Sequence, residues 1–285
     1  METTTFKEKS SFTADGVAYR RTFTDIPLSQ EIWGILLTLQ APPTLEELKR
    51  MVNRTMLAFF EARYLMTDKL LEKSGIRQVF ELAAGLSIRG ALFAQETGAR
   101  YVELDLPGEI KVKRKIMDDL LVRRKIADPQ GLYFVEGDVT NPADFAKASS
   151  YLSLGSPIAV ICEGLLRYIS FADKEILGKS IHDLLKQSGG MWITPDVEFL
   201  PAAENAVQTS HFAFLKEKSG IDIRPNLFKD EIHAVSFFEG LGFSVEKIPL
   251  DELVPVLASP RKAALTQEEI DYALRDRWTY VMRPL

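Results

Sequence analysis

The 285 residues have room for one large domain or two small ones. The composition, with 46% hydrophobic and 26% charged residues, is typical of a globular protein. This composition excludes a disordered chain and a disulfide scaffold. The formal net charge of −5 gives no sign of binding to nucleic acid or to an anionic membrane surface, both of which attract basic proteins. One cysteine and three histidines exclude an internal disulfide and leave few ways to build a metal site, so we expect no bound metal.

Residues 1–75 are predicted to form a helical extension at the N-terminus. Met1–Ser10 is polar and lacks the apolar core of a signal peptide, and no apolar run elsewhere approaches the roughly 20 residues that span a bilayer, so we expect a cytoplasmic protein. Thr44–Glu47 is typical of a capped helix start. Apolar residues then recur at helical spacing through Leu48–Leu71, and Lys73–Gly75 predicts the end of that helix.

The middle of the chain alternates short apolar runs with amphipathic segments. Five runs bounded by Gly, Pro or charge are predicted to be buried strands: Gln78–Leu82, Arg100–Leu104, Leu132–Glu136, Ile158–Cys162 and Met191–Thr194. Three helices are predicted between them: Ile88–Thr97, Ile110–Ala127 and Ala172–Gln187. This alternation predicts right-handed crossovers and a parallel sheet that is buried on both faces.

The C-terminal part adds two predicted strands, Phe243–Lys247 and Tyr280–Arg283, with a helix between them at Thr266–Asp276. The fold class is therefore α/β, a doubly wound, mostly parallel seven-stranded sheet. We expect one domain over residues 1–285. Val197–Gly220 is predicted to be helical and interrupts the alternation, so residues 195–225 are expected to insert as a cap over the site.

Ligands of an open parallel sheet bind beyond the carboxyl ends of its strands. After the first strand comes a turn of small residues, Glu81–Leu86, whose backbone a ligand can approach closely. Asp105 follows the second strand, 20 residues beyond Gly85, a position from which a carboxylate can accept the hydroxyls of a ribose. Asp138 and Glu163 follow the third and fourth strands. Together these four features favour a nucleoside-type cofactor.

Each of these features also has a local explanation. A small-residue turn can serve close packing alone, a single acid after a strand can cap a helix, and Asp138 can start a turn with Asn141-Pro142. A dinucleotide needs the Gly-x-Gly-x-x-Gly cradle, whereas here only Gly85 stands in the relevant place. S-adenosylmethionine carries a cationic sulfonium and no phosphate, so acidic residues suit it better than they suit NAD.

At these positions the sequence resembles the leucine carboxyl methyltransferase family, most closely its polyketide-type O-methyltransferases related to the tetracenomycin pathway. The similarity touches most of the chain from Ser11 to Gly190. The matching segments are Ser11–Ala14, Val17–Arg20, Thr24–Pro27, Phe80–Arg89, Val102–Pro107 with Lys113-Arg114, Gly137–Thr140 and Cys162–Ile169.

The resemblance implies a methyltransferase fold that binds S-adenosylmethionine. It places Arg63 on the carboxylate of this donor, Asp105 on its ribose and Glu163 near its amino group. It also implies that the donor contacts Glu81, Ala83, Gly85, Leu106, Asp138 and Val139. The sequence departs from the family pattern at Ala83, where Gly is usual, and at Ser87-Ile88, where Asp-Thr is usual. A methyl group at Ala83 crowds a turn that is built for close approach, so weaker donor binding is expected.

Several residues have competing interpretations. Arg63 could lie on the surface of its helix beside Glu61. Glu163 follows a buried strand, where an unpaired carboxylate is costly, so a partner is expected. His211 in the predicted cap is a candidate general base. Arg167 could pair with a substrate carboxylate, and Tyr168 could face the acceptor or serve packing.

The sequence thus predicts an S-adenosylmethionine-dependent O-methyltransferase that acts on a carboxylate or phenolic hydroxyl of a small molecule. Two alternatives stay open. One is an NAD(P)-dependent oxidoreductase, against which the missing glycine pattern counts. The other is a catalytically inactive, methyltransferase-like binding protein, which Ala83 and Ser87 leave possible. Oligomeric state and the identity of the acceptor are not predicted.

Overall fold

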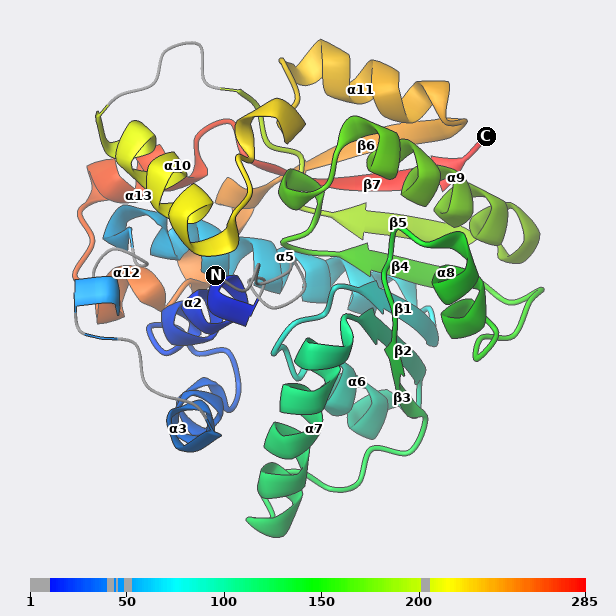
Figure 1. Cartoon of the computed structure of the whole chain (residues 1–285), viewed down its shortest axis with the longest axis horizontal. Helices are drawn as coiled ribbons and strands as arrows, with labels where there is room; N and C mark the ends of the chain where they lie inside the picture. The colour runs from blue at the N-terminus through cyan, green and yellow to red at the C-terminus, as the bar shows by residue number, and fades with distance from the viewer. Residues whose placement is uncertain (1–10, 40–43, 45, 49–52, 201–205) are drawn as a thin grey trace, which may run out of the picture.

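A computed structural model describes residues 11–39, 44, 46–48, 53–200 and 206–285 of the chain. Its centre is a seven-stranded sheet in the order β3-β2-β1-β4-β5-β7-β6 (Figure 1). Neighbouring strands from β3 to β5 are parallel, and β7 runs antiparallel to both β5 and β6. The strands are β1 Gln78–Leu82, β2 Arg100–Asp105, β3 Leu132–Glu136, β4 Ile158–Cys162, β5 Gly190–Thr194, β6 Phe243–Pro249 and β7 Trp278–Pro284. The predicted mostly parallel sheet is confirmed.

Helices cover both faces of the sheet and extend beyond one end of it. The α-helices are α2 Ser11–Arg21, α3 Ser29–Leu39, α5 Leu57–Ser74, α6 Arg89–Thr97, α7 Pro107–Val122, α8 Pro142–Ser149, α9 Phe171–Ser188, α10 Ala206–Ser219, α11 Glu231–Gly240, α12 Ser259–Lys262 and α13 Gln267–Leu274. The 3₁₀ segments are η1 Arg54–Met56, η2 Leu166–Tyr168, η3 Arg224–Asn226 and η4 Leu250–Val256.

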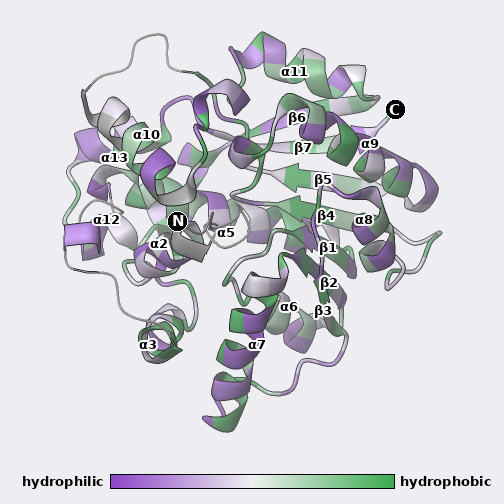
Figure 2. Ribbon diagram, in the orientation of Figure 1, coloured by the Kyte–Doolittle hydropathy of each residue, from purple (hydrophilic) through white to green (hydrophobic). Residues whose placement is uncertain are grey.

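The alternation of side chains along each strand divides the core into two layers. Phe80 and Trp192 point to the face that packs against α8, α9 and α11. Val79 and Tyr101 point to the other face, where they meet α5 and α6. The inner strands are apolar, and helices such as α7 and α9 have one polar and one apolar side (Figure 2). Both faces are therefore covered, as a parallel sheet requires.

Two segments lie over the carboxyl-terminal end of the sheet. Helix α2 packs against α5 and against α10, and all three gather at the same end of the molecule (Figure 1). Phe214 and Leu215 of α10 are buried there. Helix α2, which precedes β1, and helix α10, which follows β5, thereby form a roof above the strand ends.

Two predicted helices differ from the structure. The helix predicted over Ile110–Ala127 ends at Val122, because Arg124 adopts a left-handed φ of 53° that a helix cannot continue through. The helix predicted over Val197–Gly220 is wrong at its start, since Phe199 forms a bridge with Phe228 and α10 begins only at Ala206. Residues 201–205 lie outside the described part.

The long helix predicted from Thr44 to Leu71 is also interrupted. Thr44 and Glu47 make the expected capping bonds, with the Glu47 amide donating to Thr44 Oγ1 at 3.2 Å. Residues 49–52 lie outside the described part. Asn53 then caps the separate turn η1, and α5 begins at Leu57 and ends at a left-handed Gly75 as predicted. In the described residues no helix is both long and apolar enough to cross a membrane.

Candidate functional site

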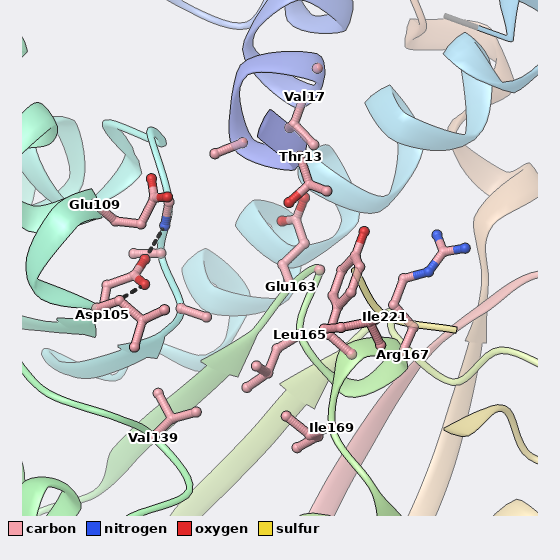
Figure 3. A pocket seen from close by; sticks show the side chains of 18 of the residues that line it. Thr13, Val17, Asp105, Glu109, Val139, Glu163, Leu165, Arg167, Ile169 and Ile221 are labelled. Carbon is pink, nitrogen blue, oxygen red and sulfur yellow. Dashed lines mark hydrogen bonds between the residues drawn. The ribbon is translucent and has the colours of Figure 1, made fainter. Parts of the chain in front are cut away.

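A cavity of about 640 Å³ opens at the carboxyl ends of β1 to β4, beneath α2 and α10. Pockets of this size accommodate small molecules and cofactors. The turn after β1, Asp105 after β2, the 137–140 turn after β3 and the segment from Glu163 after β4 all contribute to its wall. Asp105 and Glu109 lie at one end of the cavity and Arg167 and Ile221 at the other (Figure 3). The chain thus brings the predicted strand-end residues to one place.

The turn after β1 is held in a left-handed conformation. Ala83 and Gly85 both have φ of 53°, which an alanine adopts only at an energetic cost. The Ala83 amide donates to the Leu104 carbonyl at 2.8 Å, so the neighbouring strand fixes the turn. The Ala83 methyl group therefore stands on a strained backbone at the cavity wall, where the family pattern has Gly.

Asp105 is the carboxylate that ties this turn to β2. Its two oxygens accept the amides of Gly85 and Leu106, each at 2.7 Å, and the side chain is 6% exposed. Burial raises the pKa of Asp105, and these two amides oppose that rise. A carboxylate has about four acceptor positions, so Asp105 can still accept hydroxyl groups of a ligand.

Asp138 starts a turn, as one of its two interpretations predicts, and it also lines the cavity; its contact with a donor stays a prediction. Its Oδ1 accepts the Thr140 amide at 3.0 Å and the Thr140 hydroxyl at 2.7 Å, and its carbonyl accepts the Asn141 amide, so it does start a turn. Asp138 and Val139 also line the cavity, and Val139 lies on the side of Asp105 (Figure 3). The local turn therefore presents these residues to the ligand space.

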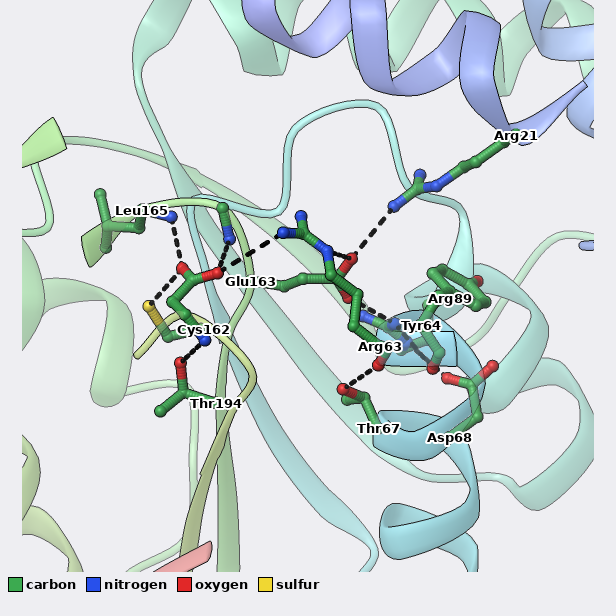
Figure 4. Close-up of polar contacts among 12 residues, drawn as sticks. Arg21, Arg63, Tyr64, Thr67, Asp68, Arg89, Cys162, Glu163, Leu165 and Thr194 are labelled. Atoms are coloured by element: carbon green, nitrogen blue, oxygen red, sulfur yellow. Dashed lines mark hydrogen bonds and ion pairs between the residues drawn. The ribbon is translucent and has the colours of Figure 1, made fainter. Parts of the chain in front are cut away.

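A buried network of arginines surrounds Glu163 (Figure 4). Arg63 Nε donates to Glu163 Oε1 at 3.2 Å, Arg89 Nη2 donates to Oε2 at 2.9 Å, and Arg21 of α2 lies 3.9 Å away. Burial by itself raises the pKa of Glu163, but Arg89, Arg63 and Arg21 outweigh it and bring the pKa to about 2. The partner expected for Glu163 is thus found, and Glu163 is a fixed negative charge at neutral pH.

Arg63 and Glu81 occupy different places relative to the cavity. Arg63 is 4% exposed and lines the cavity, so the alternative of a surface position on α5 is wrong. Glu81, which the resemblance placed at the donor, lies behind the turn instead. There it accepts Arg89 Nη1 and the Tyr101 hydroxyl, both at 2.7 Å, and it is absent from the described cavity wall.

Arg89 links Glu163 to this second carboxylate and to a third. Its Nε donates to Asp68 Oδ1 at 2.6 Å, and its guanidinium lies 4.0 Å from the Tyr64 ring centroid. Burial raises the pKa of Asp68 to about 6, although Arg89 opposes that rise. Arg89 therefore ties α5, β1 and the segment after β4 together below the cavity.

Sequence reasoning missed Asp196, which follows β5. Its Oδ1 accepts the Gly164 amide and its Oδ2 accepts the Leu165 amide, both at 2.6 Å. Arg63 Nη1 lies 3.8 Å from the same carboxylate. Reading the residues after the fifth strand, as was done for the first four, would have found it. Asp196 shapes the segment after β4 that enters the cavity.

The far end of the cavity combines cations with aromatic rings. The Arg20 guanidinium of α2 lies 4.3 Å from the Phe60 ring centroid, and Arg63 lies 4.9 Å from the same ring. Arg167 pairs with Glu198 at 3.3 Å and lies 5.8 Å from the Tyr168 ring. We call Arg20, Arg63, Arg167, Phe60 and Tyr168 the arginine wall.

The positive charges of the arginine wall influence the pKa of Arg20. Burial, helped by the nearby charges of Arg63 and Arg167 and opposed by Tyr168, lowers the pKa of Arg20 to about 10. Arg20 ends the matching segment Val17–Arg20, but the sequence assigned no role to it or to Arg21. His211 belongs to α10, but its side chain lies outside the described part, so its predicted role as a base stays a prediction.

The fold and this site define a class: an α/β protein with a mostly parallel sheet and a cavity at its strand ends, roofed by α2 and α10. The model of the leucine carboxyl methyltransferase family matches residues 28–181, more than half of the chain. The chain belongs to the leucine carboxyl methyltransferase family. The family predicted from the sequence is confirmed. The match to a methyltransferase family gives no support to the alternative of an NAD(P)-dependent oxidoreductase.

Several proteins are similar to this chain, and three of them are described next. A protein of Mycobacteroides abscessus, whose name assigns it to the S-adenosyl-L-methionine-dependent methyltransferases, is 28% identical over 111 residues; the match spans 39% of this chain and only 34% of that relative. A DUF574-family protein from Streptomyces avermitilis shares the fold at a TM-score of 0.58 with 15% identity, covering 96% of each chain. Magnesium protoporphyrin IX methyltransferase from Synechocystis, solved with bound SAH, has a TM-score of 0.45 and 14% identity, covering 89% of this chain and 90% of its own.

Proposed function

We propose that the chain is an O-methyltransferase that methylates a carboxylate or a phenolic hydroxyl of a small molecule, with a carboxylate preferred. The observation that carries this preference is the arginine wall. Two guanidinium groups, Arg20 and Arg167, act on each other electrostatically at one end of an otherwise largely apolar cavity, beside Arg63, which Glu163 and Asp196 already flank. An anionic acceptor would relieve their mutual repulsion and pair with them.

The other end of the cavity fits the methyl donor. We propose that the Ala83–Gly85 backbone holds its methionine portion, Asp105 accepts its ribose hydroxyls, and Asp138 and Val139 together with Leu106 contact its adenine. These residues line one continuous cavity, and Asp105 keeps acceptor positions that its two backbone partners do not use. When bound, S-adenosylmethionine supplies an electrophilic methyl group, to which an acceptor oxygen bonds as the carbon–sulfur bond breaks.

Arg63 is the residue proposed to hold the carboxylate of the donor. Glu163 and Asp196 flank its guanidinium, so its side chain is fixed before any ligand arrives. Glu163 stays ionised over the whole neutral range because its pKa is about 2. It would attract the cationic end of the donor while it orients Arg63.

Methyl transfer to an ionised carboxylate needs no general base, because the nucleophile is already an anion. The chain must then align the acceptor and exclude water. Helix α2 and the buried Phe214 and Leu215 of α10 form the roof that can do so. A phenol would need a base, and His211 is the proposed one. A polyketide-like acceptor and a cytoplasmic location remain predictions from the sequence.

Calorimetry followed by a methylation assay tests the proposal. Purified protein should bind S-adenosylmethionine and S-adenosylhomocysteine but not NADH. It should then form S-adenosylhomocysteine from a panel of aromatic and aliphatic acids more readily than from the matching phenols. Binding without turnover on any member of the panel would favour the inactive binding protein, and failure to bind S-adenosylhomocysteine would overturn the proposal.

Arginine variants test the preference for acids. Arg167→Met should raise the KM of an acid acceptor about tenfold or more, since a charge-assisted hydrogen bond is lost, with little change for a neutral phenol. Arg261→Met, which alters an exposed arginine far along the chain, serves as the control. Equal effects of Arg167→Met on acids and phenols would remove the arginine wall as the source of the preference.

A further inference from the structure

A buried lysine joins two segments that line the acceptor end of the cavity. We call residues 165–170, which follow β4, the strand segment, and residues 221–227, which follow α10, the cap segment. Lys174 lies in the first turn of α9 and is 2% exposed. Its Nζ donates to the Ile169 carbonyl at 2.7 Å and to the Asn226 carbonyl at 2.8 Å. One ammonium group thus bonds to both segments.

The buried ammonium group of Lys174 needs bonding partners, because a charged group in a protein interior costs free energy unless it is paired or hydrogen-bonded. Within the described part of the chain, no carboxylate forms an ion pair with Lys174. Its Nζ also lies 4.5 Å from the ring centroid of Phe171 and 5.8 Å from that of Phe228. The two carbonyls are therefore its principal partners, and a neutral aliphatic side chain would leave both of them unpaired.

A second bond joins the same two segments. Asn226 Nδ2 donates to the Arg167 carbonyl at 3.2 Å. Arg167 and Ile169 of the strand segment line the cavity, as do Ile221 and Asn226 of the cap segment. Arg167 and Ile221 lie at the same end of the cavity (Figure 3). Lys174 and Asn226 together make a single wall from residues that are about fifty positions apart in the sequence.

We propose that Lys174 is a positioning residue for the acceptor: its ammonium group holds the strand segment and the cap segment together as one wall. Binding of the acceptor then depends on Lys174, whereas binding of the donor does not, because the proposed donor residues, from Arg63 to Glu163, lie outside the two segments that Lys174 joins. The identity of the bound acceptor rests on the function proposed above. The link between the two segments rests on the contacts of Lys174 and Asn226 alone.

Lys174→Met tests the proposal, because methionine keeps the length and removes the charge and the donors. Amide hydrogen exchange should become faster in both segments. The dissociation constant of S-adenosylhomocysteine should stay within about twofold, while the KM of an acid acceptor rises about tenfold or more, as expected for a lost bond to a charged group. Lys179→Met, on the exposed side of the same helix, is the matched control and should change none of these.

Two further variants keep the test decisive. Lys174→Arg retains a cation with several donors and should restore most of the exchange protection and of the acceptor KM. If Lys174→Met does not fold, Asn226→Ala removes the bond to Arg167 and should speed exchange in the strand segment by itself. Unchanged exchange in these variants, or an equal loss of S-adenosylhomocysteine and acceptor binding, would overturn the proposal. The hydrogen-exchange measurement needs no acceptor. If the wild-type protein does not bind S-adenosylhomocysteine, the proposed function is overturned, but hydrogen exchange still tests the link between the two segments.

Discussion

Asp105 and Ala83 contribute to the donor end of the cavity in opposite ways. Asp105 satisfies two backbone amides and still has acceptor capacity for a ligand. Ala83 adds a methyl group to a left-handed turn that a glycine would occupy without strain. A single change at either position should therefore alter donor affinity in a predictable direction.

Asp105→Asn should weaken binding of S-adenosylhomocysteine at least tenfold, or about 1.5–3 kcal/mol, because an amide NH₂ replaces one oxygen and the charge is lost. Calorimetry gives the dissociation constant. Asp118→Asn, on the exposed side of α7, is the control. A dissociation constant that stays within twofold of the wild type would contradict the role of Asp105 at the ribose.

Ala83→Gly should tighten donor binding, since the change removes the methyl group from the cavity wall. Folding stability should change by less than about 1 kcal/mol, because the relief of left-handed strain and the added freedom of the unfolded glycine nearly cancel. Ala264→Gly is a matched control, as Ala264 has a similar φ of 49° and does not line the cavity. Equal or weaker donor binding by Ala83→Gly would show that the methyl group does not crowd the donor.

At the scale of elements, the site depends on segments that follow strands rather than on the strands themselves. The segment after β4 carries Glu163, Arg167 and Tyr168, and Asp196 after β5 determines its conformation through bonds to three successive amides, Gly164 to Leu166. Helix α2 reaches the same place through Arg21. The acceptor end is thus assembled by contacts between loops and helices.

Asp196→Ala should lower the free energy of unfolding by at least about 2 kcal/mol, because buried amides lose their acceptor and Arg63 loses a neighbouring charge. Urea unfolding followed by circular dichroism measures this loss. Asp118→Ala should change stability by less than about 0.5 kcal/mol, as is usual for exposed sites. A stability loss no larger than that of the control would mean that Asp196 does not organise the segment.

At the scale of the whole molecule, the arginine network connects α2, α5, α6, β1 and the segment after β4. Its acids respond differently to their surroundings: burial raises the pKa of Asp68 to about 6, whereas the arginines bring that of Glu163 to about 2. Within β2, burial also raises the pKa of Glu103 to about 7, although Lys113 opposes that rise. The stability of the fold should therefore depend on pH in separate windows.

Glu163→Gln should destabilise the protein at pH 7 by about 3–5 kcal/mol, because it leaves buried arginines without their partner. The folded pKa of Glu163 lies below its unfolded value, so its contribution is complete above about pH 4.5 and is lost as the pH falls toward 2. Urea midpoints of the variant and the wild type should thus converge between pH 4.5 and pH 2. Glu252→Gln, in an exposed pair with Lys69, should show a small difference at every pH; a constant gap for Glu163→Gln would contradict the assigned pKa.

The sequence by itself determined the fold class and the family. Buried parallel strands are continuous apolar runs between breakers, and this local signal found β1, β3 and β4 with their observed bounds. It also found the strand-end residues, because the carboxyl ends of parallel strands must meet at one edge. It failed at Val197–Phe199, where pairing with Phe228 overrides local helical propensity.

Only the tertiary structure decided which charges meet. Arg63 and Glu163 are 100 residues apart, and Lys174 and Asn226 are 52 apart. No periodicity encodes such pairs, since a charge on a helix can as well face water as a partner. The fold removes these groups from water, and an unpaired charge there is too costly to persist. Burial therefore selected the arginine network, the wall joined by Lys174 and the position of α2 over the cavity.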